Sequence, residues 1–174
     1  RRYLIADEDT MAYNLGYGDH GGCTYHQSPE QIQQWYKQWN KDNRRFYAYI
    51  VRTEDRAYIG EVNARRSNDA DWYEMGIIVE SKYRGRGYAV EALKLLLKYA
   101  FDTLGAEAVH NDFEEVRAAA VKTHLAAGFS KYKRYNGNIE LLITKEQFER
   151  QNAIGRIASS IRRILSDSPV SIYL

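Results

Sequence analysis

The chain has 174 residues, a formal net charge of +2, and 44% hydrophobic and 28% charged residues. These values are typical of a soluble globular protein with one core, and so small a charge gives no reason to expect binding to nucleic acid or to a membrane surface. The single cysteine, Cys23, excludes an intrachain disulfide framework, and no apolar run approaches the roughly 20 residues of a membrane span, so we expect a cytoplasmic protein.

The N-terminal part predicts a glycine-rich loop followed by an amphipathic helix. The loop covers residues 11–27. Ser28 can cap the helix, Pro29 suits its first position, and Gln31 completes a capping box. Apolar residues then recur at the spacing of one helix face: Ile32, Trp35, Tyr36 and Trp39.

The middle of the chain predicts a mixture of strands and helices. Short polar turns separate the first three strands, which indicates an antiparallel meander. Gly128 is a C-cap candidate, and Asn136-Gly137 is a hairpin signal. The predicted strands are 46–52, 57–64, 72–79, 106–113, 130–135 and 139–144, and the predicted helices are 89–101 and 116–127.

The end of the chain predicts a further helix, from residue 144 onward, with a break near Gly155. Its apolar stripe consists of Ile154, Ile157, Ala158, Ile161, Ile164 and Leu165. We expect residues 1–148 to form one domain and residues 149–174 to form a C-terminal helical extension. The stripe then packs on the domain or forms a contact in a homodimer, and a helix lying on a membrane surface is the weaker alternative.

The run from Arg84 to Ala89 lies where a strand gives way to a helix. A helix start offers unpaired N–H groups and the positive end of its dipole, glycine allows a close approach of the backbone, and arginine suits phosphate oxygens. The dinucleotide pattern fails because its third glycine would be Val90, and no P-loop spacing is present. A third pattern, Gln/Arg-x-x-Gly-x-Gly/Ala, is matched by Arg84, Gly87 and Ala89.

This third pattern resembles the acyl-CoA pyrophosphate loop of the GNAT superfamily of N-acetyltransferases. Residues 73–79 are similar to the fourth strand of that family, and residues 120–129 are similar to its later helix, which ends in Gly-Phe. The amino-acid sequence of residues 87–101 is most similar to the branch of the family that includes ribosomal-protein N-terminal acetyltransferases. That branch also holds many small-molecule acetyltransferases, so it leaves the acceptor open.

The resemblance implies an α+β fold with a mixed, mostly antiparallel central sheet, flanking helices, and a splay between the two central strands. The pantetheine arm of acetyl-CoA would bind in the splay, against main-chain atoms of Ile78 and Val79. The pyrophosphate would bind the turn formed by Arg84, Gly85, Arg86, Gly87, Tyr88 and Ala89. No spacing of histidine, cysteine or acidic residues suggests a metal.

Acetyl transfer needs a neutral amine, so a base is expected near the start of the central strand. Family members often carry a base there, and Glu74 is the leading candidate in this chain. Three other carboxylates could serve as the base or attract a cationic substrate instead: Glu61, Asp69 and Asp71.

The departing thiolate must be protonated, and the family commonly uses a tyrosine four positions before the Gly-Phe pair. In this chain that position holds His124, which could act as the acid because histidine titrates near neutrality. Tyr132 and Tyr135 are alternative candidates for this acid. Strand alternation directs only one of His110 and Asn111 into the cleft.

We therefore expect an N-acetyltransferase that moves an acetyl group from acetyl-CoA to a primary amine by direct attack. The loop at 11–27 and the helix after Ser28 would form much of the wall around the acceptor amine. Their tyrosines and tryptophans suit a peptide, a polyamine and an aminoglycoside about equally well. The alternative is a non-catalytic acyl-CoA-binding module of the same fold that acts as a sensor or partner.

Overall fold

The computed structural model describes residues 28–42 and 44–166, so the predicted loop at 11–27 and Cys23 lie outside the described part. In chain order the elements are α2 (Pro29–Trp39), β1 (Arg45–Val51), β2 (Tyr58–Arg66), β3 (Tyr73–Val79), the short 3-10 helix η2 (Ser81–Tyr83), α3 (Tyr88–Asp102), β4 (Ala108–Glu114), α4 (Ala118–Ala127), β5 (Ser130–Tyr135), β6 (Asn138–Thr144) and α5 (Lys145–Ser166).

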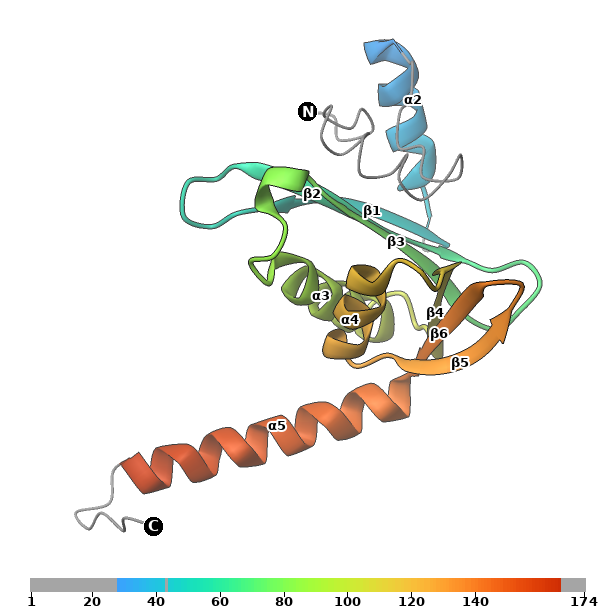
Figure 1. Cartoon of the computed structure of the whole chain (residues 1–174). Helices are drawn as coiled ribbons and strands as arrows, with labels where there is room; N and C mark the ends of the chain where they lie inside the picture. The colour runs from blue at the N-terminus through green and yellow to red at the C-terminus, as the bar shows by residue number, and fades with distance from the viewer. Residues whose placement is uncertain (1–27, 43, 167–174) are drawn as a thin grey trace.

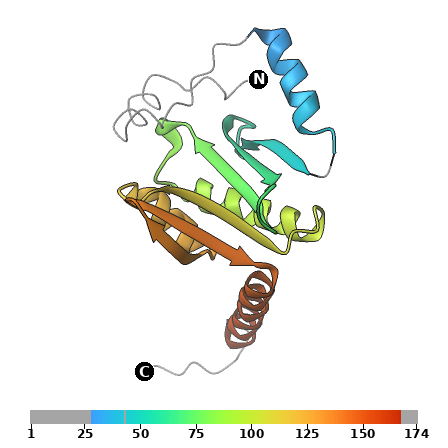
Figure 2. The same cartoon turned by 90° about the vertical axis from the view of Figure 1, so that its right-hand side faces the viewer.

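The strands form one six-stranded sheet in the order β1-β2-β3-β4-β6-β5. Neighbouring strands are antiparallel throughout, except for β3 and β4, which are parallel. Helices α3 and α4 cover one face of the sheet, and α2 lies on the opposite side near β1 (Figure 1, Figure 2). The sheet face opposite α3 and α4 is called the α2 face below. The predicted mixed α+β fold is confirmed.

The main core lies between the sheet and helices α3 and α4. The largest of its members with a relative exposure of 0% are Leu93, Leu97, Val109, Ile139, Leu141 and Ile143. A smaller aromatic core on the α2 face consists of Tyr47 packed against Trp35, Trp39 and Tyr49. None of the helices described combines the length and apolar character that a bilayer crossing requires.

Helix α2 begins as the sequence predicts. The side chain of Ser28 accepts a hydrogen bond from the backbone N–H of Gln31, and the backbone N–H of Ser28 donates to the Gln31 side chain at 2.7 Å. These reciprocal bonds satisfy N–H groups that a helix start leaves open. The other predicted strands and helices begin and end within two residues of their predicted bounds.

The predicted break near Gly155 is wrong, because α5 runs without interruption from Lys145 to Ser166. A glycine inside a helix costs only about 1 kcal/mol relative to alanine, which the helix-forming residues on both sides offset. The helix projects away from the domain (Figure 1). Its first turns are anchored, since Phe148 packs on Phe101 with ring centroids 5.1 Å apart and Gln151 donates to the Gly128 carbonyl at 3.0 Å.

Candidate active site

The turn between β3 and α3 requires glycine at two positions. Gly85 has φ of 75° and Gly87 has φ of 84°, both in the left-handed region that other residues rarely adopt. Gly87 is the N-cap of α3, and its carbonyl accepts the N–H groups of Val90 and Glu91. The N–H groups of the residues before Val90 lie in the turn that the sequence predicts as an anion site.

Strands β3 and β4 pair only at their beginnings, where Tyr73 lies opposite Val109 and Glu74 lies opposite His110. Beyond these two positions β3 continues to Val79 without pairing to β4, while its other edge stays paired with β2. The sheet therefore opens between β3 and β4 toward the glycine turn. This is the splay that the sequence resemblance implies.

The main-chain groups that face this opening follow from strand alternation. The N–H of Glu80 bonds to the Ile59 carbonyl of β2, and residues in an antiparallel strand point alternately to the two sides. Ile78 therefore belongs to the β2 ladder, whereas Val79 and Ile77 face the opening. The Nε of Arg84 donates to the Val79 carbonyl at 2.9 Å, so this arginine ties the turn to the end of the strand. Sequence reasoning missed Ile77, which the register of the strands identifies.

Glu74 lies on the α2 face at the root of the opening, and Arg65 of β2 is its ion-pair partner. Arg65 Nε donates to Glu74 Oε2 at 2.9 Å, and its Nη2 contacts the same oxygen. The Glu74 side chain is 34% exposed, so solvent and a substrate can reach its carboxylate. Local sequence patterns do not predict this pair, because it depends on the β2–β3 register.

His124 is buried in α4, with a relative exposure of 2%. Its Nδ1 lies 2.8 Å from the Ala120 carbonyl and its Nε2 lies 2.9 Å from the Asn111 amide nitrogen. An Nδ1–H that donates to Ala120 leaves Nε2 as the acceptor from Asn111, and burial lowers the pKa of His124. This hydrogen-bond pattern fits the tautomer protonated at Nδ1, in which Nε2 has no proton to donate.

A second acidic group, Glu61, lies on β2 opposite Ile78 and is almost fully buried at 3% exposure. The hydroxyl of Tyr47 donates to its carboxylate. Burial raises the pKa of Glu61, and burial together with the Glu61 charge raises the pKa of Tyr47. This pair joins a titratable carboxylate to the aromatic core of the α2 face. A carboxylate in such a place can hold a cation or exchange a proton.

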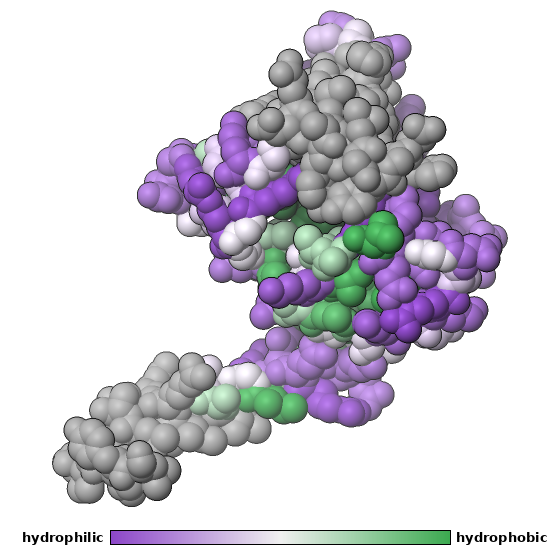
Figure 3. Space-filling view, in the orientation of Figure 1, coloured by the Kyte–Doolittle hydropathy of each residue, from purple (hydrophilic) through white to green (hydrophobic). Residues whose placement is uncertain are grey.

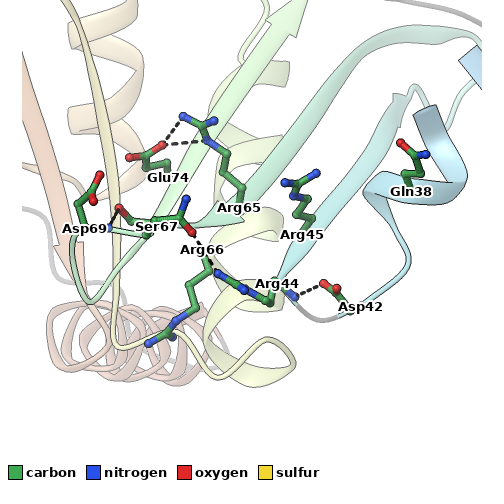
Figure 4. Close-up of a pocket in the computed structure, with 10 residues that line it drawn as sticks. Gln38, Asp42, Arg44, Arg45, Arg65, Arg66, Ser67, Asp69 and Glu74 are labelled. Carbon is green, nitrogen blue, oxygen red and sulfur yellow. Dashed lines mark hydrogen bonds and ion pairs between the residues drawn. The ribbon is translucent and has the colours of Figure 1, made fainter. Parts of the chain in front are cut away.

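A cavity of about 440 Å³ adjoins Glu74 on this side of the sheet (Figure 4). Polar residues line it, and those that are charged have both signs: Gln38, Asp42, Arg44, Arg45, Arg65, Arg66, Ser67, Asn68, Asp69 and Glu74. The guanidinium of Arg45 lies 5.4 Å from the ring centroid of Trp39, and Arg66 pairs with Asp71 at 2.7 Å. Two of the carboxylates predicted to attract a cation are thus found around this cavity, Asp69 as a lining residue and Asp71 as the partner of Arg66.

Two predicted substitutes for the acid lie on β5 and are exposed. Tyr132 is 49% exposed and Tyr135 is 43% exposed, with the Tyr135 hydroxyl donating to Asp112 at 2.9 Å. Neither lies on β3 or β4, the strands that border the opening. Within residues 28–42 and 44–166, no cluster of three or more histidine, cysteine or acidic side chains could hold a metal ion.

A family model for the GNAT acetyltransferase domain matches residues 2–130. The chain belongs to the GNAT acetyltransferase family. The predicted enzyme class, an N-acetyltransferase of the GNAT type, is confirmed. No curated protein matches the sequence significantly.

Solved structures of GNAT enzymes share the fold. A mutant of the spermidine N-acetyltransferase from Vibrio cholerae superposes with a TM-score of 0.62 at 15% identity, covering 84% of this chain and 96% of that one. The same Vibrio enzyme in complex with CoA and spermine gives 0.62 at 16% identity, covering 83% and 95%. The N-acetyltransferase PseH from Campylobacter jejuni, in complex with acetyl coenzyme A, gives 0.54 at 17% identity, covering 67% and 79%. At these identities the likeness shows the fold alone.

Proposed function

We propose that this GNAT enzyme uses acetyl-CoA and acetylates a primary amine by direct attack. The observation that carries this proposal is the restricted pairing of β3 with β4, which opens the sheet directly above the glycine turn. An extended pantetheine arm can pair with the main chain in such an opening, as an added strand would. The related structures with bound CoA or acetyl coenzyme A support the same cofactor.

The cofactor site that we propose has two parts. The pyrophosphate lies on the turn from Arg84 to Ala89, where N–H groups at the start of α3 and the charges of Arg84 and Arg86 meet it. The pantetheine follows the end of β3, with main-chain contacts at Val79 and Ile77, because the main-chain groups of Ile78 are paired with β2. The Val79 carbonyl already accepts one hydrogen bond from Arg84 Nε, and its second lone pair can accept another from the pantetheine.

The acceptor enters from the α2 face, because α3 and α4 cover the other face of the sheet. Glu61, Glu74 and Glu140 share the α2 face, and their charges favour a cationic amine. Two Vibrio structures named above belong to a spermidine acetyltransferase, so a polyamine is the first acceptor to test. A protein N-terminus, as in the ribosomal-protein branch, is the second.

The predicted base, Glu74, and the predicted acid, His124, differ in how well their surroundings suit these roles. Glu74 keeps an open position beside the acceptor, although its pairing with Arg65 favours a role in holding the ammonium group over a role as base. His124 would need to turn away from Asn111 before it could protonate the thiolate. We therefore assign His124 the task of holding Asn111, and the thiolate receives the second proton that the attacking amine loses.

The test is thiol release from acetyl-CoA with three amines: spermidine, an aminoglycoside and a peptide with a free N-terminus. We expect turnover with at least one amine and no thiol release without an amine. Binding of acetyl-CoA with no turnover on any of the three would contradict the enzyme and favour the non-catalytic acyl-CoA-binding module.

A further inference from the structure

His110 occupies the position on β4 where the splay begins. It lies opposite Glu74 in the last paired position of β3 and β4, on the α2 face. Its neighbour Asn111 points to the other face, where it contacts His124. Strand alternation thus resolves which of the two faces the acceptor: it is His110.

The imidazole of His110 is buried and incompletely satisfied. Its relative exposure is 6%, and within residues 28–42 and 44–166 neither ring nitrogen has a hydrogen-bond partner. The indole of Trp72 stacks on it with ring centroids 4.7 Å apart, and the Trp72 N–H also lacks a partner in that part of the chain. Buried polar atoms without partners cost free energy, and they mark places where a structure serves a function other than stability.

A carboxylate stands beside this histidine. Glu140 Oε2 of β6 lies 3.4 Å from His110 Nε2, and the Glu140 side chain is 16% exposed. A carboxylate beside one ring nitrogen stabilises the imidazolium and orients the ring, so the other nitrogen can accept a proton. The remaining titratable groups nearby are Glu74, opposite on β3, and Tyr132 of β5, whose ring lies 6.3 Å from that of Trp72. Asp112 of β4 and Lys133 of β5 lie opposite Glu140 on its two neighbouring strands.

We propose that His110, oriented by Glu140, is the base that takes the proton from the acceptor ammonium at the root of the splay. This rests on the proposed acetyl transfer. The ammonium gives one proton to the imidazole, and the neutral nitrogen attacks the thioester carbonyl, forming the C–N bond. The C–S bond breaks, the amide nitrogen loses a second proton to the CoA thiolate, and His110 returns its proton to solvent.

The experiment is the pH dependence of kcat/KM for His110→Gln, Glu140→Gln and Glu74→Gln. We expect His110→Gln to lower kcat about 100-fold or more and to abolish the rise of kcat/KM near neutral pH. Glu140→Gln lowers kcat and retains that rise, because the ring loses the carboxylate that orients it but keeps its basic nitrogen. Glu74→Gln raises KM for the amine and leaves the rise in place.

Asp112→Asn is the matched control, since Asp112 lies two residues along the same strand and faces the same side. We expect its kcat/KM to stay within about twofold of wild type. Activity of a folded His110→Gln variant within threefold of wild type, or loss of the neutral rise in Glu74→Gln alone, overturns the His110 proposal and leaves the enzyme proposal standing. A wild-type protein that releases no thiol with any amine overturns both.

Discussion

Three carboxylates on the α2 face differ in the side chain with which each one interacts. Glu74 is paired with Arg65, Glu61 is buried against Tyr47, and Glu140 stands beside His110. Each carboxylate thus has a different partner, although all three face the acceptor side of one sheet. The partner therefore determines which carboxylate is available to a cationic substrate.

Removing the partner of Glu74 should strengthen binding of a cationic amine. In Arg65→Gln the carboxylate loses its guanidinium partner, and we expect KM for spermidine to fall by up to about fivefold with little change in kcat, since an exposed ion pair is worth at most about 1 kcal/mol. Arg66→Gln is the control, because Arg66 lines the same cavity but pairs with Asp71. Steady-state kinetics in which both variants behave alike would contradict this role of Glu74.

His124 should make stability depend on pH. Burial lowers its pKa in the folded chain, so below the ordinary value of about 6.5 the unfolded chain binds a proton that the folded chain does not. Stability therefore falls as the pH drops below about 6.5. Urea unfolding between pH 5 and pH 7 should show a steeper loss in wild type than in His124→Gln, by up to about 1.4 kcal/mol per pH unit. An equal dependence of the free energy of unfolding on pH in both proteins would mean that folding does not lower the pKa of His124.

At the scale of elements, the β3–α3 turn combines two demands on one glycine. Gly87 must adopt a left-handed conformation to start α3, and its neighbours must bring their N–H groups to a phosphate. A side chain at this position meets no neighbouring atom within 4 Å, so strain in the backbone is the only obstacle in the free protein.

Gly87→Ala should therefore lose stability and cofactor affinity together. We expect a loss of about 1–2 kcal/mol in the free energy of unfolding and a clear rise in KM for acetyl-CoA. Gly137→Ala is matched to it, because Gly137 has φ of 81° and equally open surroundings in the β5–β6 hairpin. The control should lose similar stability with unchanged KM. An equal rise in KM in both variants would show that the turn has no special part in binding acetyl-CoA.

The order of the elements could be predicted from the sequence because local signals carry it. The capping box at Ser28, the hairpin at Asn136-Gly137 and the glycine turn are all contained within a few neighbouring residues. The partners of the site residues could not be predicted, because they depend on strand register. The Arg65–Glu74 pair and the position of His110 opposite Glu74 join residues on different strands. The environment of His124 depends on the packing of α4 against β4, which no local pattern encodes.

At the scale of the whole molecule, α5 is the element least integrated into the domain. Residues 151–156 of the helix are exposed, and Ile154 has a relative exposure of 61%. Figure 3 shows apolar surface along the projecting helix, separate from the apolar surface over α3 and α4. A helix that stands alone in water is only marginally stable. We therefore propose that residues 149–174 are an extension through which two copies of the chain associate.

Truncation after Asn152 tests this proposal, because it keeps the anchoring residues Phe148 and Gln151. Light scattering should show a smaller assembly for the truncated chain than for the full chain, while kcat/KM per chain is retained. Ile154→Glu in the full chain should weaken the assembly in the same direction. An unchanged mass in both variants would assign the contact between copies, if any, to another surface.

The central claim is that the β3–α3 turn and the β3–β4 opening together hold acetyl-CoA. The most direct test is a crystal structure of the chain with acetyl-CoA bound. We expect the pyrophosphate against the main-chain N–H groups between Arg84 and Ala89, and the pantetheine between β3 and β4 with its thioester near Glu74 and His110. A pyrophosphate bound away from this turn, or a pantetheine outside the opening, would contradict the account.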